Sequence, residues 1–318
     1  MRIDVPELCD DPLRAAGVLR AGGLVAFPTE TVYGLGVDAT NAAAVERLFA
    51  VKGRPSNNPL IVHIADIEQI ESVAGRVPAV AIELLRHFAP GPLTVVVPKR
   101  PEIVSAVTAG LDSVGVRIPA EPRTRQMLRA ADRPIAAPSA NRSGRPSCTT
   151  YRSVIEDFGG DIDAILIGQP AAIGLESTVV DCLGKAPRIL RPGAITLEQL
   201  RLVDPRATSA GKEIDPGENS PGRLHPHYRP RAFVGLVTFP TDAAPDETAA
   251  YIGLDAHPLA NRFGWHCAFA SIDDYARGFY EALREVDRRG LRSVNCQRVS
   301  AVGTGIALSD RLERAAEK

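Results

Sequence analysis

Phe27-Pro-Thr-Glu-Thr-Val-Tyr-Gly-Leu-Gly36 is the stretch that decides the fold, together with the later stretch Lys52-Gly-Arg-Pro-Ser-Asn-Asn-Pro59. Apolar residues 24–27 predict a buried strand, which ends at Pro28 because proline has no amide hydrogen for a sheet ladder. Residues 28–36, which we call the polar elbow, then bring together threonine hydroxyls, a carboxylate and a tyrosine. A helical pattern follows, and the chain reaches the cations Lys52 and Arg54. A strand, a polar elbow, a helix and a cationic loop in this order predict a site for an anionic ligand on an open sheet.

Length and composition predict a two-domain protein of the cytoplasm. The chain has 318 residues, more than one typical domain, and a net charge of −1, which argues against a protein that coats nucleic acid. No apolar run approaches the roughly 18 residues that a membrane helix needs, and the N-terminal residues lack the apolar core of a signal peptide. The five cysteines are widely scattered, as expected for reduced thiols in a cytoplasmic protein.

Hydrophobic periodicity predicts an α/β fold in both halves of the chain. Helices are expected at residues 13–19, 42–51, 79–88 and 123–131, and strands at 24–27, 60–64, 91–98, 113–119, 134–137, 163–167, 177–182 and 188–190. After a Pro- and Gly-rich segment, apolar runs at 234–239, 267–269 and from 293 alternate with helical patterns at 272–289 and 305–316. This alternation predicts a small parallel sheet. The expected division is a first domain at 1–203, a linker at 204–232 and a second domain at 233–318.

Several familiar motifs are missing or incomplete. The sequence has no Walker A, G-x-S-x-G, H-E-x-x-H or C-x-x-C motif. Residues 34–39 fit the loose form of a dinucleotide fingerprint, but Lys52 and Arg54 stand where its acidic residue is expected. His225 and His227 have no further zinc ligand at a suitable spacing. His63 is open to two interpretations, a core histidine bonded to the backbone or a site residue.

Cations and hydroxyls gather at strand ends and on the loops after them. The cations are Lys52, Arg54, Arg117 and Arg191, and the hydroxyl-rich loops carry Ser139, Asn141, Ser143, Ser147 and the sequence Glu176-Ser-Thr178. Together they favour a site for a polyphosphate and a carboxylate. Because no nucleophile is paired with a base, we expect catalysis by positioning and charge neutralisation, as in nucleotidyl transfer.

The order of these motifs resembles the YrdC-like family. The motifs that carry the resemblance are Pro28-Thr-Glu-Thr-Val-Tyr-Gly-Leu-Gly36, Lys52-Gly-Arg-Pro55, Asn58-Pro-Leu-Ile-Val-His63, Pro90-Gly-Pro-Leu-Thr94, Val116-Arg-Ile-Pro119, Ala137-Pro-Ser-Ala-Asn141, Glu176-Ser-Thr178 and Leu190-Arg-Pro-Gly193. The linker and the sequence Gly303-Thr-Gly-Ile-Ala-Leu308 are similar to the long form of the family. The resemblance implies a twisted open mixed sheet flanked by helices, followed by a smaller Rossmann-like α/β domain.

The resemblance also implies an activity and its residues. The family makes threonylcarbamoyl-AMP from L-threonine, bicarbonate or CO2, and ATP, and releases pyrophosphate. The residues implied for threonine are Thr31, His63, Arg117, Ala137 and Ser177. Those implied for ATP are Arg54, Asn58, Ser113, Ser139, Ser147, Arg191 and Tyr228. Lys52 and Arg54 are the expected catalytic cations, and Tyr228 would make residues 220–231 a lid over the nucleotide.

Cofactors and partners follow from the same resemblance. Mg²⁺ is expected with ATP through the phosphate oxygens, without metal ligands from the protein. The product would pass to a complex that transfers the threonylcarbamoyl group to tRNA, and a transient contact with tRNA itself is compatible with this role. Two departures, Arg223-Leu-His-Pro-His227 in the linker and Asp310 where the family usually has Asn, concern the second half of the chain.

Two alternatives stay open at this point. The first is a module that binds RNA or regulates translation without forming an adenylate, although the low net charge speaks against it. The second is a carbamoyltransferase step like that in hydrogenase maturation. It normally requires a zinc-finger region, which the cysteine spacing here excludes.

Overall fold

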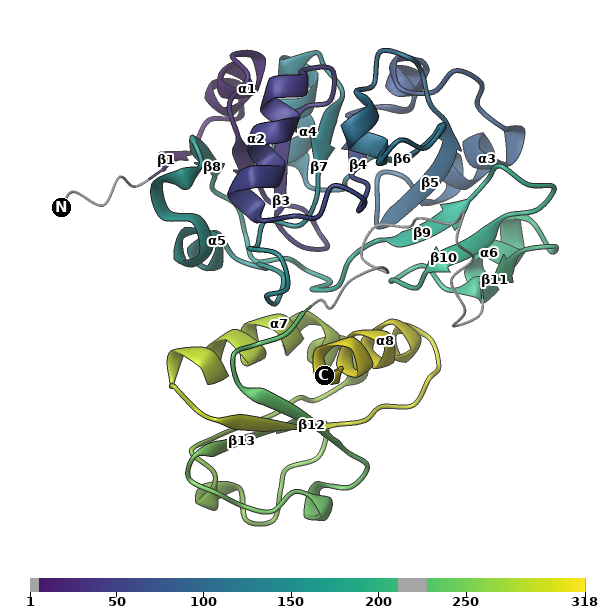
Figure 1. The fold of residues 1–318 in the computed structure, drawn as a ribbon. Helices are drawn as coiled ribbons and strands as arrows, with labels where there is room; N and C mark the ends of the chain where they lie inside the picture. Colours follow the sequence, from purple (N-terminus) through teal and green to yellow (C-terminus); the bar gives the residue numbers. More distant parts are fainter. Residues whose placement is uncertain (1–5, 211–227, 318) are drawn as a thin grey trace. The chain divides into compact units, whose positions relative to one another are not determined.

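The computed structural model describes residues 6–210 and 228–317, and the chain forms two compact units (Figure 1). Within the described residues, the first unit contains residues 6–143, 148–171 and 176–210, and the second contains 144–147, 172–175 and 228–317. Residues 211–227, which include most of the expected linker, lie outside the described residues. The domain limits at 203 and 233 therefore stay a prediction.

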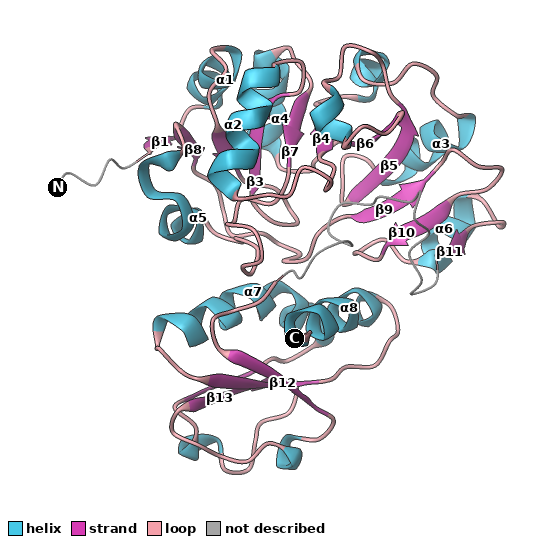
Figure 2. Cartoon of the chain, in the orientation of Figure 1, coloured by secondary structure: helices cyan, strands magenta, loops and turns pink. Residues whose placement is uncertain are grey.

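The first unit is built on a mixed sheet, which has eleven strands among the described residues (Figure 2). Their order is β1-β8-β2-β3-β7-β4-β6-β5-β9-β10-β11. These strands are β1 (Glu7–Cys9), β2 (Val25–Phe27), β3 (Gly34–Asp38), β4 (Ile61–His63), β5 (Leu93–Pro98), β6 (Ser113–Arg117), β7 (Ile135–Ala137), β8 (Ala164–Leu166), β9 (Thr178–Asp181), β10 (Arg188–Arg191) and β11 (Thr208–Ser209). The sheet contains both parallel and antiparallel pairs, with three antiparallel pairs in succession from β2 to β4, which confirms the predicted mixed α/β architecture.

The first unit has six α-helices among the described residues, and capping residues in the sequence explain where α2 begins and ends. The helices are α1 (Pro12–Arg20), α2 (Ala42–Lys52), α3 (Ala79–Phe88), α4 (Pro122–Ala131), α5 (Tyr151–Phe158) and α6 (Leu197–Val203). The Asn41 side chain caps α2 by accepting from the amide of Ala44, and α2 ends at Gly53 with a left-handed φ of 63°. This ending turns the chain so that the cationic loop starts at the last residue of the helix.

Different helices pack on the two faces of the sheet. Helices α2, α3, α5 and α6 pack on one face with a core from Val62, Val95 and Val116. On the other face, α1 and α4 pack on the strands from β8 to β7, with Val25, Phe27 and Ile135 beneath them. Farther along this second face the sheet carries a separate small apolar cluster of Ile61, Val179 and Leu190.

The polar elbow does not lead straight into a helix as expected. Its last three residues start β3, which pairs antiparallel with β2. Gly34 and Gly36 make this pairing fit, because a Cβ at Gly36 would lie 2.6 Å from the Phe27 ring. β1, α5 and α6 were also not predicted; β1 and α6 have three and seven residues, too short for a clear periodic signal.

The second unit has a four-stranded sheet among its described residues, and the sheet is parallel as predicted. Its order is β12 (Phe233–Val237), β15 (Ser293–Gln297), β13 (Ala249–Gly253) and β14 (Trp265–Ala268). Helices α7 (Ile272–Arg288) and α8 (Thr304–Ala316) pack on these strands and on each other (Figure 2). β13 was not predicted from the sequence. In the part of the chain that the structure describes, no helix is both long and apolar enough to cross a membrane.

Candidate active site

Sheet register brings several predicted site residues into one row on the second face of the sheet. His63 of β4 pairs with Arg117 of β6, and Arg117 pairs with Thr94 of β5. Paired residues of neighbouring strands project to the same face, so these three side chains lie side by side. Thr94 in turn hydrogen-bonds Ser177, whose hydroxyl lies 2.8 Å from its own. We call His63, Arg117, Thr94, Ser177 and Arg191 the polar row.

Arg117 joins the polar row to the polar elbow. Its Nη2 donates to Glu30 Oε1 at 2.7 Å and lies 3.5 Å from Thr29 Oγ1. The other carboxylate oxygen of Glu30 accepts from the amide of Ala120 at 2.9 Å. The Arg117 and Glu30 side chains are 5% and 12% exposed, so this is a buried ion pair. The pair holds a cation at the end of β6 in a fixed orientation.

Thr31 is linked to the same group through Thr29. The two hydroxyls lie 2.8 Å apart, and Thr29 Oγ1 also donates to Val32 O and accepts from the Val32 amide. Both threonines are buried. This turn, stabilised by the threonine side chain, presents the Thr31 hydroxyl beside the buried ion pair.

His63 is a neutral group in this row. Burial lowers the pKa of its imidazole to about 3, and the nearby positive charge of Arg117 acts in the same direction. Its Nδ1 donates to Ile61 O at 3.3 Å, and the Phe27 ring packs edge-on against it with ring centroids 5.7 Å apart. The imidazole is therefore a core histidine bonded to the backbone and also a member of the row. Ala137 lies on the adjacent strand β7, opposite Ile61.

Ser177 and Arg191 form the other end of the row. Arg191 Nη2 donates to Ser177 O at 2.9 Å and to Ser177 Oγ at 3.1 Å, while Nε donates to the same carbonyl at 3.2 Å. Both residues are buried. A residue predicted for threonine and a residue predicted for ATP are thus in direct contact.

Lys52 binds the hydroxyl-rich loop rather than facing solvent. Its Nζ donates to the carbonyls of Ser139 and Asn141, and its side chain is buried. The Ser139 hydroxyl lies 2.5 Å from Asn141 Oδ1, and the residue bridges to Gly34 in the polar elbow. The cationic loop, the 139–141 loop and the elbow are therefore contiguous in the first unit. This contiguity is what a shared site requires.

Arg54 and Asn58 organise the rest of the cationic loop. Arg54 donates to Asn58 Oδ1 at 2.7 Å, to Asn58 O at 3.0 Å and to Pro59 O at 2.8 Å. Asn58 is fully buried and ties Arg54 to the end of the loop. Ser113 lies at the start of β6 and lines a small hollow of about 20 Å³ together with Thr94 and Val179. The hollow adjoins the polar row.

Ser147 and Tyr228 group with the second unit, and their assignment to ATP stays a prediction. The Tyr228 ring is buried, with φ at 69°, beside Tyr280 at a centroid distance of 5.2 Å and beneath the guanidinium of Arg311 at 5.5 Å. Ser147 is also buried, and its neighbour Pro146 accepts from Arg284 Nη2 at 2.5 Å. Residues 220–227 of the expected lid, with His225 and His227, lie outside the described residues.

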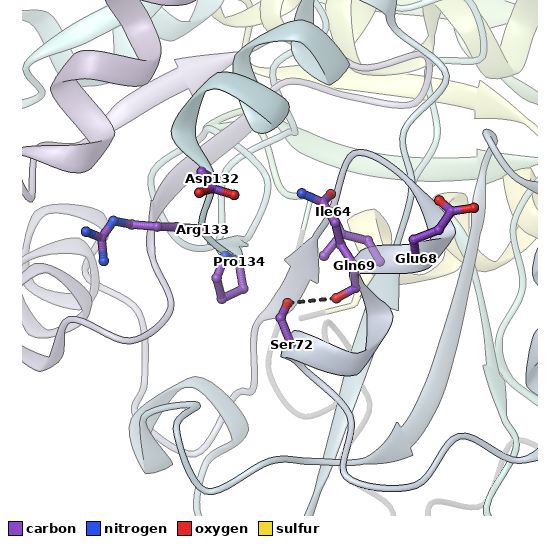
Figure 3. A pocket seen from close by; sticks show the side chains of 7 residues that line it. All are labelled: Ile64, Glu68, Gln69, Ser72, Asp132, Arg133 and Pro134. Carbon is purple, nitrogen blue, oxygen red and sulfur yellow. Dashed lines mark hydrogen bonds between the residues drawn. The ribbon is translucent and has the colours of Figure 1, made fainter.

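A larger cavity of about 150 Å³ lies away from these residues. It is lined by Ile64, Glu68, Gln69, Ser72, Asp132, Arg133 and Pro134 (Figure 3). None of the predicted site residues lines it. Ile64 follows His63 and belongs to the core on the first face of the sheet, whereas His63 projects to the second face. The polar row, and not this cavity, is therefore the candidate site.

Sequence reasoning missed three residues that hold the site together. Glu30 was counted only as a carboxylate in the elbow, and neither Thr29 nor Thr94 received a role. The available signal was a polar residue in an apolar context, because Thr94 is the hydroxyl in the strand sequence Leu-Thr-Val-Val-Val. Among the described residues, no cluster of three or more His, Cys, Asp or Glu side chains suits a metal ion.

Comparison with known proteins shows which family the chain belongs to. The Sua5–YciO–YrdC family model, described as "Telomere recombination", matches residues 17–193, and the model of the threonylcarbamoyl-AMP synthase C-terminal domain matches residues 195–317. The threonylcarbamoyl-AMP synthase of Pyrococcus abyssi is 41% identical over 95% of this chain and 92% of its own length. The Bacillus subtilis synthase is 39% identical with the same two shares.

A solved structure supports the same relationship. The crystal structure of P. abyssi Sua5 complexed with L-threonine superposes with a TM-score of 0.88 at 38% identity. The match covers 96% of this chain and 94% of that one. Both domain models, the relatives and the architecture point the same way: this chain belongs to the Sua5/YrdC family of threonylcarbamoyl-AMP synthases.

Proposed function

We propose that this protein makes threonylcarbamoyl-AMP and pyrophosphate from L-threonine, bicarbonate or CO2, and ATP. The observation that carries the proposal is the polar row, in which a buried cation, a neutral imidazole and a buried hydroxyl lie side by side on three adjacent strands and the loop before β9. This set matches an amino acid, whose carboxylate Arg117 would bind and whose polar groups Thr31 and Ser177 would contact. The relative whose crystal structure contains L-threonine has the same fold over nearly the whole chain.

The chemistry needs positioning more than it needs a protein nucleophile. The threonine nitrogen attacks the carbon of CO2, a C–N bond forms, and the nitrogen loses a proton to give a carbamate. A carbamate oxygen then attacks the α-phosphorus of ATP, and the bond to the departing pyrophosphate breaks. Since a carbamate decays in water, an enclosed site helps by excluding water and by aligning the two reactants.

Cations of the first unit are suited to the negative charge of this reaction. Arg54 and Arg191 would bind the phosphates as planar forks, with Asn58, Ser113 and Ser139 as polar contacts. Lys52 would contribute positive charge while it holds the 139–141 loop through its two carbonyl bonds. Mg²⁺ would enter with ATP and bind through phosphate oxygens.

The product would be consumed by a tRNA threonylcarbamoyl-transfer complex, and the cytoplasm is where this step would take place. The relatives that span this chain are named as synthases, and nothing comparable favours the RNA-binding alternative. The carbamoyltransferase alternative has no support from these full-length relatives either.

The direct test is pyrophosphate release by the purified protein with ATP, bicarbonate and each amino acid in turn. Release that requires both threonine and bicarbonate is the expected result. Lys52→Ala and Arg54→Ala should nearly abolish it. Arg289→Ala, which removes a half-exposed arginine directly after α7, is a control with normal release expected. Release that ignores threonine, or normal release by either cationic variant, would contradict the proposal.

A further inference from the structure

Ser177 and Arg191, two predicted substrate contacts, are hydrogen-bonded to each other, and Thr94 bonds the same Ser177 hydroxyl in a buried chain of three residues. Thr94 Oγ1 lies 2.8 Å from Ser177 Oγ, which accepts from Arg191 Nη2 at 3.1 Å. None of the three is more than 5% exposed. Since the Ser177 hydroxyl oxygen accepts a hydrogen bond from Arg191, its own hydrogen can be donated to Thr94 or to a ligand. The orientation of the Ser177 hydroxyl therefore depends on both Thr94 and Arg191.

Thr94 is held in the rotamer that makes this contact. It pairs in register with Arg117 on one side and with Val179 on the other. A Cβ built on Gly115 would lie 3.1 Å from the Thr94 methyl carbon, so the absence of a side chain at Gly115 leaves room for that methyl group. A β-branched side chain with its methyl group placed in this way has little freedom at χ1. Its hydroxyl is thus fixed toward Ser177.

We propose that Thr94 is a positioning residue that couples the binding of threonine to the binding of ATP, through Ser177 and Arg191. The inference rests on the proposed function, in which Ser177 contacts threonine and Arg191 contacts the nucleotide. In this proposal Thr94 acts by orienting the Ser177 hydroxyl and not by contacting a substrate.

The sign of the coupling follows from the hydrogen bonds. When the nucleotide engages Arg191, the guanidinium holds Ser177 more firmly through its carbonyl and hydroxyl. Threonine then meets a Ser177 hydroxyl that is already ordered, and less conformational entropy is lost on binding. Each substrate should raise the affinity of the protein for the other, by the same factor because binding linkage is reciprocal.

The experiment measures threonine binding to the full-length protein by calorimetry, with and without a non-hydrolysable ATP analogue and without bicarbonate. In the wild type we expect the analogue to tighten threonine binding about fivefold or more. Thr94→Val, which keeps the shape and removes the hydroxyl, should reduce this factor to about twofold or less. Thr94→Ser keeps the hydroxyl and should restore most of the factor.

Thr150→Val is the matched control. It also removes a threonine hydroxyl paired with a serine hydroxyl, at 2.9 Å from Ser153, but at the start of α5. It should weaken the helix cap and leave the coupling factor unchanged. Thermal unfolding of each variant shows whether the Thr94 variants are folded, and Thr94→Ser supplies the answer if Thr94→Val unfolds.

The outcomes separate this inference from the proposed function. A wild type that binds threonine without any effect of the analogue would overturn the coupling. An undiminished factor in Thr94→Val, or an equal loss in Thr150→Val, would overturn the role of Thr94. A wild type that makes threonylcarbamoyl-AMP in the pyrophosphate assay keeps its proposed function under all three results, so failure of the coupling does not imply failure of the activity.

Discussion

Replacing Arg117 by glutamine tests its role in the fold separately from its proposed role in threonine binding. Arg117 donates to Glu30 at 2.7 Å, and both side chains are nearly buried. At this distance an effective dielectric constant of about 20 corresponds to a gross attraction of about 6 kcal/mol. Desolvation offsets much of that attraction in the intact pair. Removal of one partner, however, leaves the other charge buried and unpaired, which typically costs about 3–5 kcal/mol.

We therefore expect Arg117→Gln to lower the free energy of unfolding by about 3–5 kcal/mol. In the double variant Glu30→Gln, Arg117→Gln neither charge is left unpaired, so most of this loss should be recovered. Threonine-dependent pyrophosphate release should be lost in both variants, because neither has a cation for the threonine carboxylate. Stability is measured by urea unfolding, with Glu30→Gln alone completing the cycle.

Two results would refute this reasoning. A double variant no more stable than Arg117→Gln would show that the buried carboxylate is not the cause of the loss. A double variant with wild-type threonine dependence would show that Arg117 does not bind the substrate carboxylate. The pyrophosphate assay on the folded double variant is the informative measurement, because loss of activity in that variant cannot be attributed to unfolding.

Three further predictions follow from individual contacts. Burial lowers the pKa of His63 from 6.5 to about 3, so between these pH values the folded state binds fewer protons than the unfolded state. The free energy of unfolding should therefore fall as the pH drops from 6.5 toward 3. Urea unfolding of His63→Gln should show a weaker pH dependence over the same range. Tyr228→Ala should raise the KM for ATP without unfolding the protein. An unchanged KM would show that Tyr228 does not contribute to ATP binding. Gly36→Ala should lower the unfolding free energy by about 1–3 kcal/mol because its Cβ would overlap Phe27, whereas Gly17→Ala, with its nearest neighbour 3.9 Å away, should be neutral or stabilising.

The local elements of the fold could be predicted because their signals are local. The strand before Pro28 and the helix ending at Gly53 follow from proline, glycine and the spacing of apolar residues. β3 was missed because its glycines are typical of a turn. The Phe27 ring, which lies against Gly34 and Gly36, explains why this strand has glycine at both positions. That contact depends on the pairing of two strands, which no short window of sequence contains.

The candidate site also has a part that the sequence predicts and a part that it does not. The cations and hydroxyls could be singled out by residue type and by their position after strands. Their partners could not, because the contacts of Arg117 with Glu30 and of Lys52 with Ser139 span more than 80 residues of sequence. The role of Thr94 becomes clear only when register places it beside Arg117, and that of Glu30 only when the folded elbow brings it to the same arginine.

The way in which the polar row is built explains why a sheet can serve a reaction that depends on positioning. His63, Arg117 and Thr94 sit at one level on adjacent strands, so ladder hydrogen bonds fix their separations. Loop residues reach the same precision only where they are tied down, as Lys52 ties the 139–141 loop through two carbonyls. Because misplacement of a reactant by about 1 Å can cost a rate factor on the order of 100, these ties matter as much as the groups that touch the substrate. Under the proposed function, Glu30 and Thr94 therefore contribute by holding the groups that meet the substrates.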